Sequence, residues 1–140
     1  LETIVSRTLD DVLADFEAAT AGTGGPAARL REATRRYALR HATHRREALV
    51  VNRDTLSLPE PALSAMRERR REHERAIRSI ITLGIESGAF AVGNAGLASF
   101  AILEMSVSIA RWFREGGART AEQVADEYAE FALRIVRYRP

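Results

Sequence analysis

Apolar residues recur at helical spacing along most of this chain of 140 residues. The clearest case is the segment 120–136, where the apolar positions are Ala121, Val124, Ala125, Tyr128, Phe131, Ala132 and Ile135. A repeat of three to four residues places side chains on one face of an α-helix. Thr120 is the first residue of this segment, and Gln123 lies three positions after Thr120, which is the spacing of a capping box. The sequence therefore predicts an amphipathic helix that begins just after Thr120.

The segment before it is apolar on all sides. From Leu97 to Phe113 nearly every position is apolar or small, and such a helix must be covered on more than one side. The short turn 114–118 joins it to the last helix, so the two are expected to form an antiparallel hairpin. Because this hairpin has more apolar surface than one small domain needs, we expect a second copy to pack against it across a two-fold axis.

Four more helices are predicted upstream. The first ends at the loop from Thr20 to Pro26, and its stripe consists of Leu1, Ile4, Val5, Leu9, Val12, Leu13 and Phe16. The others are expected at Ala27 to about His44, at about Arg46 to Leu56 with an apolar face that includes Leu49 and Val50, and at about Pro61 to Ser87. No segment alternates with period two, as a strand would. The fold class predicted is all-α, a bundle of about six helices forming one domain over residues 1–140.

The start of the chain carries a further expectation. Residue 1 is Leu and already belongs to the first apolar stripe, so we expect the first helix to connect backward to a segment outside this chain.

Composition excludes several classes of function. Cysteine is absent and the net charge is only +2, so thiol chemistry is excluded and the charge is not typical of a nucleic-acid-binding domain. No charge-free apolar run reaches the roughly 18 residues of a membrane span. Nucleophile and phosphate-loop motifs are also missing. We expect a cytoplasmic protein that is not an enzyme and has no cofactor, metal or membrane partner.

Polar residues interrupt the apolar stripes at a few positions. Tyr37, His41 and His44 share a face of the second helix, Arg70 and His73 share the face of Met66 and Ile77 on the fourth, and Glu104 lies in the apolar fifth helix. Since an unpaired buried charge costs several kcal/mol, Glu104 either is exposed, pairs with an arginine, or faces a ligand pocket opposite Arg70, His73 and Tyr37.

Two other groups have simple interpretations. His41 and His44 are spaced like ligands on one helix face, but hydrogen bonding near the helix end explains them as well. The arginines Arg67, Arg69, Arg70, Arg71, Arg75 and Arg78 alternate with Glu68, Glu72 and Glu74, which is typical of a solvated face with i, i+4 pairs. The alternative for them is an anionic ligand group, such as a coenzyme A phosphate.

The second half of the chain resembles a known family. The segment SGAF, the apolar helix, and then ARWFREGGARTAEQVADEYAEFALRIV are similar to the C-terminal half of TetR-family transcriptional regulators. The resemblance is close over about Gly84 to Val136 and extends to the rest by helix pattern. It implies a ligand-binding and dimerisation domain, with operator DNA bound only through a helix-turn-helix domain absent from this chain.

The resemblance also implies a homodimeric repressor domain with a small, largely apolar effector, such as an acyl thioester or a lipid-like molecule. The pocket is expected between the second, third, fourth and fifth helices, with candidate ligand-binding residues Tyr37, His41, Met66, Arg70, His73, Phe100 and Glu104. The candidate interface residues are Ser108, Trp112, Val124, Tyr128, Phe131 and Ile135. Two alternatives stay open, a structural dimerisation module without ligand, and a helical enzyme or metal protein in which His41, His44 and Glu104 converge.

Overall fold

The computed structural model describes residues 2–54 and 57–140. These residues form helices, turns and loops without any strand, as the apolar periodicity predicts. The helices are α1 (Glu2–Thr20), α2 (Pro26–Thr43), α3 (Arg45–Asp54), α4 (Ala62–Glu86), α5 (Ala95–Val107), α6 (Ile109–Trp112) and α7 (Ala121–Ile135). None of the helices in the described part of the chain is both long and apolar enough to cross a membrane.

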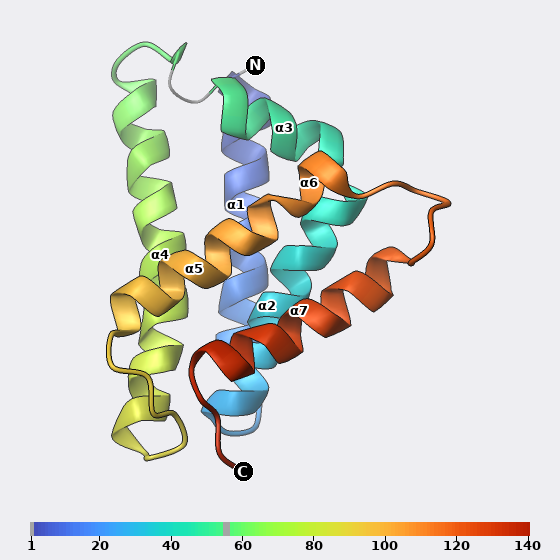
Figure 1. Ribbon diagram of the computed structural model, residues 1–140. Helices are drawn as coiled ribbons and strands as arrows, with labels where there is room; N and C mark the ends of the chain where they lie inside the picture. Colours follow the sequence, from blue (N-terminus) through green and yellow to red (C-terminus); the bar gives the residue numbers. More distant parts are fainter. Residues whose placement is uncertain (1, 55–56) are drawn as a thin grey trace.

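The helix α2 lies at the centre of the bundle, in contact with α1, α4, α5 and α7 (Figure 1). Pro26 occupies its first turn, where the missing N–H would have no intrahelical partner. The main core combines apolar side chains from α1, α2, α4, α5 and α7, among them Phe16, Leu30, Ile77, Ile80, Ile81, Ile102 and Leu133. A smaller cluster joins α1, α3 and α4 through Val5, Leu9, Val51, Leu58 and Met66.

The long apolar segment does not form one helix. It divides at Ser108 into α5 and the short α6, which corrects the single helix expected from the sequence. The hydroxyl of Ser106 donates to the carbonyl of Ile102 at 2.9 Å, and that of Ser108 donates to Met105 at 2.7 Å. Serine hydroxyls that bond back to the preceding turn compete with the backbone ladder and bend helices.

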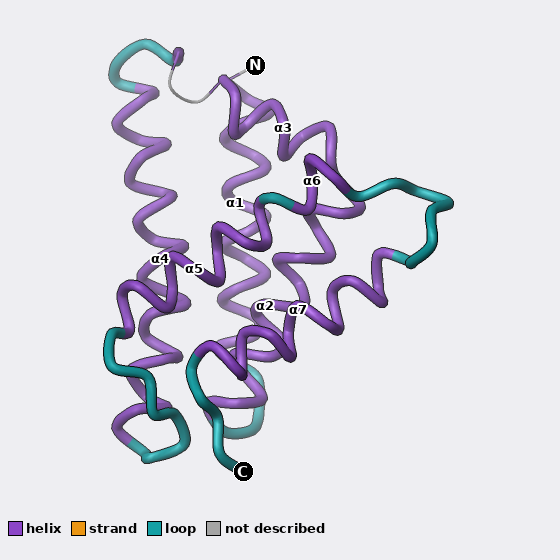
Figure 2. The backbone as a smooth tube through the Cα atoms, viewed as in Figure 1, coloured by secondary structure: helices purple, strands orange, loops and turns teal. Residues whose placement is uncertain are grey.

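The last helix begins as predicted. Thr120 accepts a hydrogen bond from the backbone of Gln123, and the Gln123 side chain accepts one from the backbone of Thr120. The segments α5 and α7 run in opposite directions (Figure 1), and the loop between α6 and α7 projects to one side of the bundle (Figure 2). However, α7 packs mainly along α2 rather than along α5.

The predicted apolar face of α3 is rotated, and that of α1 has one exposed member. On α3, Leu49 is exposed and Val50 half-buried, whereas Ala48 and Val51 are buried. On α1, Val5, Leu9, Val12 and Phe16 are buried as expected, but Ile4 is 48% exposed. Leu1 of the first stripe and Leu56 at the predicted end of the third helix lie outside the described residues.

The end of α4 is held by a close contact between Gly84 and Phe90. A Cβ atom at Gly84 would lie 1.9 Å from a ring carbon of Phe90, so only glycine fits under this ring. Phe90 also donates its backbone N–H to the carbonyl of Gly84 at 2.9 Å. Gly88, at φ +81°, then turns the chain away from the helix in the left-handed conformation that glycine favours.

Candidate functional site

A cavity of about 220 Å³ lies among α1, α2, α3, α4 and α5. Six of the seven predicted ligand-binding residues line it: Tyr37, His41, Arg70, His73, Phe100 and Glu104. Met66 does not line it, because its side chain packs into the small apolar cluster of α1, α3 and α4. The cavity also has a wall from α1, which the sequence-based expectation did not include.

Aromatic rings form the buried side of the cavity. Tyr37 lies 5.2 Å from Phe16 and 4.5 Å from His41 between ring centroids, and His73 meets Phe16 edge-on at 5.7 Å. The Tyr37 hydroxyl makes no hydrogen bond to any residue that the structure describes. Burial, with a smaller opposing effect of Arg70, raises the pKa of Tyr37 above its ordinary value. The hydroxyl therefore stays protonated and is available to a ligand.

The two histidines have fixed tautomers. His41 Nδ1 lies 2.8 Å from the carbonyl oxygen of Tyr37, and His73 Nε2 lies 2.9 Å from that of Leu9. A carbonyl oxygen only accepts hydrogen bonds, so each of these nitrogens must carry a proton. Burial lowers the pKa of both imidazoles, that of His73 to about 4. At neutral pH each ring is therefore uncharged, and its second nitrogen is a hydrogen-bond acceptor.

The cavity is lined by equal numbers of arginine and glutamate side chains. Arg40 and Arg70 are opposed by Glu74 and Glu104. Glu74 is buried and accepts a hydrogen bond from Ser99 at 2.8 Å, whereas Glu104 is exposed and forms no ion pair within the described residues. Arg70 donates to the carbonyl of Val51 at 3.3 Å. The sequence allowed Glu104 to be exposed or to face a pocket, and the structure places it at the exposed edge of this cavity.

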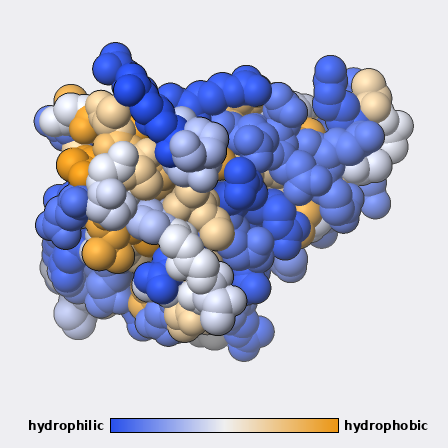
Figure 3. Space-filling model, turned by 90° about the horizontal axis from the view of Figure 1, so that it is seen from below, coloured by the Kyte–Doolittle hydropathy of each residue, from blue (hydrophilic) through white to orange (hydrophobic). Residues whose placement is uncertain are grey.

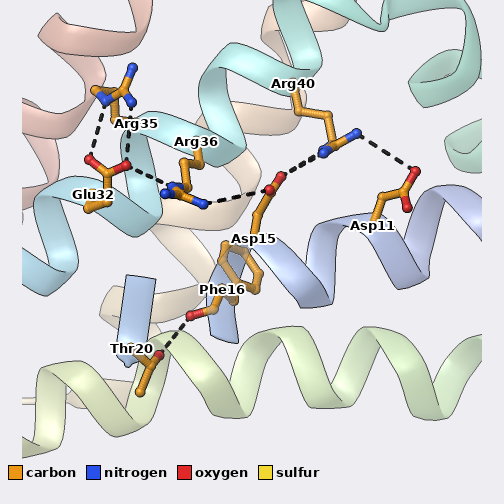
Figure 4. Close-up of polar contacts among 8 residues, drawn as sticks. All are labelled: Asp11, Asp15, Phe16, Thr20, Glu32, Arg35, Arg36 and Arg40. Carbon is orange, nitrogen blue, oxygen red and sulfur yellow. Dashed lines mark hydrogen bonds and ion pairs between the residues drawn. The ribbon is translucent and has the colours of Figure 1, made fainter. Parts of the chain in front are cut away.

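Ion pairs attach α1 to the helices that form the cavity. Arg40 of α2 donates to Asp15 of α1 at 2.8 Å and lies 4.0 Å from Asp11 (Figure 4). On the other side, Arg69 of α4 donates to Asp10 at 2.7 Å. Together with the bond from His73 to the Leu9 carbonyl, these contacts tie the position of α1 to the walls of the cavity.

The arginines of α4 are mostly explained by pairing. Arg71 and Arg75 both contact Glu68, and Arg78 contacts Glu74 at 3.5 Å. The two pairs with Glu68 lie on a solvated face, as the charge alternation indicates, whereas Glu74 is buried. Of the six arginines in this segment, only Arg70 lines the cavity.

The histidines of α2 do not share a site with Glu104 that could bind a metal. His44 is exposed and its Nδ1 lies 2.9 Å from the hydroxyl of Thr43. Among the described residues, no group of three histidine or acidic side chains is arranged to hold a metal ion.

The predicted interface residues occupy different environments. Trp112, Tyr128 and Phe131 form a row of rings, with centroids 6.4 Å and 5.6 Å apart. Trp112 is 48% exposed, while Ser108, Tyr128, Phe131 and Ile135 are half-buried. Val124, by contrast, packs within the protomer against Ala38, Ile109 and Phe113. Its side chain therefore offers little surface to a partner.

Apolar surface is also exposed elsewhere. Leu97 is 66% and Phe100 is 55% exposed, and Leu83 and Ile85 are exposed near the end of α4. Viewed from below, apolar residues gather at the left, on the side where α4 and α5 lie in Figure 1 (Figure 3).

Sequence reasoning missed several residues of the cavity. Leu103 and Val107 follow Phe100 by three and seven positions, a spacing that places them on its face of the helix and could have identified them. Leu9 and Val12 of α1 gave no such signal, because their place in a regular apolar stripe indicates only burial. Glu74 belongs to the charge alternation that is typical of a solvated face, so its pattern does not indicate burial.

Comparisons with known proteins agree with this architecture. A family profile described as "Tetracyclin repressor-like, C-terminal domain" matches residues 23–136. A TetR-family regulatory protein from Rhodococcus RHA1 is 26% identical with a TM-score of 0.91, and the match covers 99% of this chain and 73% of that one. PfmR from Thermus thermophilus, a TetR-family regulator, is 28% identical with a TM-score of 0.86, over 95% of this chain and 72% of that one.

A more distant structure shares the fold alone. AibR, solved in complex with isovaleryl coenzyme A and operator DNA, is 18% identical with a TM-score of 0.80, over 93% of this chain and 71% of that one. No curated protein matches the sequence significantly. Because the family profile spans most of the described helices, the chain belongs to the tetracyclin repressor-like C-terminal domain family of TetR-type transcriptional regulators.

Proposed function

We propose that the chain is the effector-binding and dimerisation domain of a transcriptional repressor. Its effector is small and largely apolar, with acyl thioesters and lipid-like molecules among the candidate classes, and it binds in the cavity among the first five helices. The observation that carries this proposal is the cavity itself, in which apolar walls surround a few convergent polar groups. Such pockets are typical of small-molecule sites.

The cavity is suited to signalling because α1 is one of its walls. Leu9 and Val12 line it, and His73 donates to the Leu9 carbonyl. An effector that moves α1, or that packs closely against it, favours one position of α1 over another. We propose that α1 leads to a helix-turn-helix domain outside this chain, through which operator DNA is bound. By linkage, DNA would then change effector affinity by the same factor as effector changes DNA affinity.

Relatives support this assignment by analogy. The AibR structure holds isovaleryl coenzyme A and operator DNA, so a protein of this fold brings both kinds of ligand together. Its identity to this chain is 18%, and we therefore take from it only that the fold is compatible with the proposal.

We further propose that two copies pair through α6 and α7. The exposed Trp112 and the half-buried Tyr128 and Phe131 form one aromatic row, and large aromatic residues are typical anchors of interfaces. A fixed dimer would also set the spacing of two DNA-reading domains on two half-sites.

A thermal-shift screen with acyl thioesters, fatty acids, steroids and small neutral phenols tests the effector site. A compound that binds the folded state raises its melting temperature by mass action. The matched control is Val107→Trp, because Val107 lines the cavity and is half-buried, and a larger side chain there fills the space. Compounds that stabilise the wild type but not this variant support the proposal. If the variant responds equally, or if nothing stabilises the wild type, the structural dimerisation module becomes the better account.

Sedimentation velocity tests the interface. The wild type should sediment as two copies of 15.5 kDa, and Phe131→Arg should shift it to one copy, because a charge would then replace an aromatic contact. Ser79→Arg, at an exposed position of α4, is the control and should leave the dimer intact. A wild-type monomer, or an unchanged dimer in Phe131→Arg, contradicts the proposed face.

A further inference from the structure

The polar chemistry of the cavity restricts which effector can bind there. His41 and His73 each use their ring proton on a backbone carbonyl, at 2.8 Å and 2.9 Å. The second nitrogen of each ring makes no hydrogen bond within the part of the chain that the structure describes. Both rings line the cavity. The cavity therefore offers a ligand two nitrogen atoms that accept hydrogen bonds and cannot donate them.

These nitrogens are held in place. His41 packs against Tyr37 with ring centroids 4.5 Å apart, and His73 packs against Phe16 at 5.7 Å. A ring flip would break the bond to the carbonyl and leave a buried acceptor unsatisfied, which is energetically unfavourable. The two acceptors are consequently part of the pocket before any ligand arrives. Burial, the largest influence on both imidazole pKa values, lowers them and keeps the rings neutral near pH 7.

The charge balance of the cavity does not favour an ion. Two arginines, Arg40 and Arg70, are opposed by two glutamates, Glu74 and Glu104. Arg40 is already paired with Asp15 at 2.8 Å. A carboxylate or phosphate would also set its lone pairs against those of the two imidazoles. The group that matches the site is neutral and carries a proton that it can donate.

The size of the cavity limits the ligand further. A protein cavity of about 150 Å³ with apolar walls can take up benzene. The cavity here has about 220 Å³, which leaves room for one ring with small substituents. The Tyr37 hydroxyl, unpaired within the described residues, can donate to a ligand oxygen that gives its own proton to a histidine.

We propose that the effector is a compact neutral molecule, about the size of one substituted ring, whose hydroxyl group donates a hydrogen bond to the open nitrogen of one of these two histidines. This inference rests on the proposed function and narrows the class of effector. A thioester or ester carbonyl only accepts hydrogen bonds and leaves both ring nitrogens unpaired. A carboxylate adds an uncompensated charge.

Three matched probes test the inference on the wild-type chain by NMR titration. The probes are p-cresol, which has a hydroxyl, 4-methylanisole, in which a methyl group replaces the donated proton, and p-toluate, which is a carboxylate. A net hydrogen bond corresponds to about a three- to tenfold change in affinity. We expect p-cresol to bind about three- to tenfold more tightly than 4-methylanisole, and p-toluate to bind more weakly than either.

Two variants remove the open ring nitrogens but keep the bonds to the backbone carbonyls. In His41→Asn, the amide nitrogen stands near the position of Nδ1 and can still donate to Tyr37. In His73→Gln, the amide nitrogen stands near the position of Nε2 and can still donate to Leu9. At least one of them should reduce the preference for p-cresol over 4-methylanisole to about one, while 4-methylanisole binds as before. Thr82→Ala, at an exposed site of α4 outside the cavity, should retain the wild-type preference.

The outcomes separate this inference from the function on which it rests. If p-cresol and 4-methylanisole bind the wild type equally, or p-toluate binds best, the cavity is a ligand site but the hydroxyl assignment is wrong. If both histidine variants keep the preference, the assignment is also wrong. If no probe shifts signals from cavity residues, both the hydroxyl assignment and the effector site lose their support.

Discussion

Mild acid should destabilise the protein through His73. The imidazole is 4% exposed, and burial holds its pKa at about 4, against an ordinary value of 6.5. The bond to the Leu9 carbonyl and the charge of Asp10 act in the opposite direction, while Arg70 and His41 lower the pKa further. Between about pH 4 and pH 6.5 the unfolded chain binds a proton at His73 and the folded chain does not.

The direction and size of the effect follow from this difference. A lowered pKa in the folded state contributes stability that is fully present above about pH 6.5 and is lost as the pH falls toward 4. Between pH 7.5 and pH 5, with pKa values of about 6.5 unfolded and about 4 folded, the loss is about 2 kcal/mol. His41 also has a pKa lowered by burial and adds to the loss in the same direction. Most carboxylates remain ionised at pH 5, so their contribution to this window is small.

Urea unfolding of the wild type and of His73→Gln at about pH 7.5 and about pH 5 isolates the contribution of His73 to stability. The glutamine amide can still donate to the Leu9 carbonyl but does not titrate. The free energy of unfolding of the wild type should therefore fall by about 2 kcal/mol more than that of the variant. An equal fall in both proteins would refute the claim that this imidazole is buried in its neutral form. His73 would then offer no neutral acceptor nitrogen to a ligand in the cavity.

Two further substitutions test packing and capping. Gly84→Ala should lower the free energy of unfolding by about 1–3 kcal/mol, because a Cβ there collides with the Phe90 ring; Gly93→Ala, where nothing lies within 4 Å, is the control, and equal melting temperatures for the two variants would contradict the contact. Thr120→Ala should cost about 1 kcal/mol by removing the capping box of α7. An unchanged urea midpoint for Thr120→Ala would show that the cap contributes nothing to stability.

Much of the fold could be predicted because helices are encoded locally. The stripe of α4 from Met66 through His73 to Ile81 is buried as its spacing indicates, and the cap at Thr120 forms between residues three positions apart. The division at Ser108 was harder to predict, because serine is tolerated within helices and its effect depends on whether the hydroxyl bonds back to the preceding turn.

The candidate site was predictable only in part, for a physical reason. Polar residues in apolar stripes, such as Tyr37, Arg70 and His73, indicate buried polar groups that need partners or a ligand. An ordinary apolar residue carries no such information. Thus Met66 fills the contact between α1 and α4, whereas Leu9 lines the cavity, and only the tertiary arrangement of α1 distinguishes the two. Val124 likewise fits the stripe of α7, but the packing of α7 along α2 buries it within the protomer.

Hydrogen exchange of α1 with the cavity occupied is the measurement that tests the proposed regulatory function most directly. The ligand is the strongest stabiliser from the thermal-shift screen, and exchange is compared with and without it in the wild type and in Val107→Trp. Amides around Leu9 to Val12 should slow more than those of α7, and Val107→Trp should abolish the difference. Slowing that is uniform over the chain, or confined to α7, would contradict the claim that the cavity controls α1.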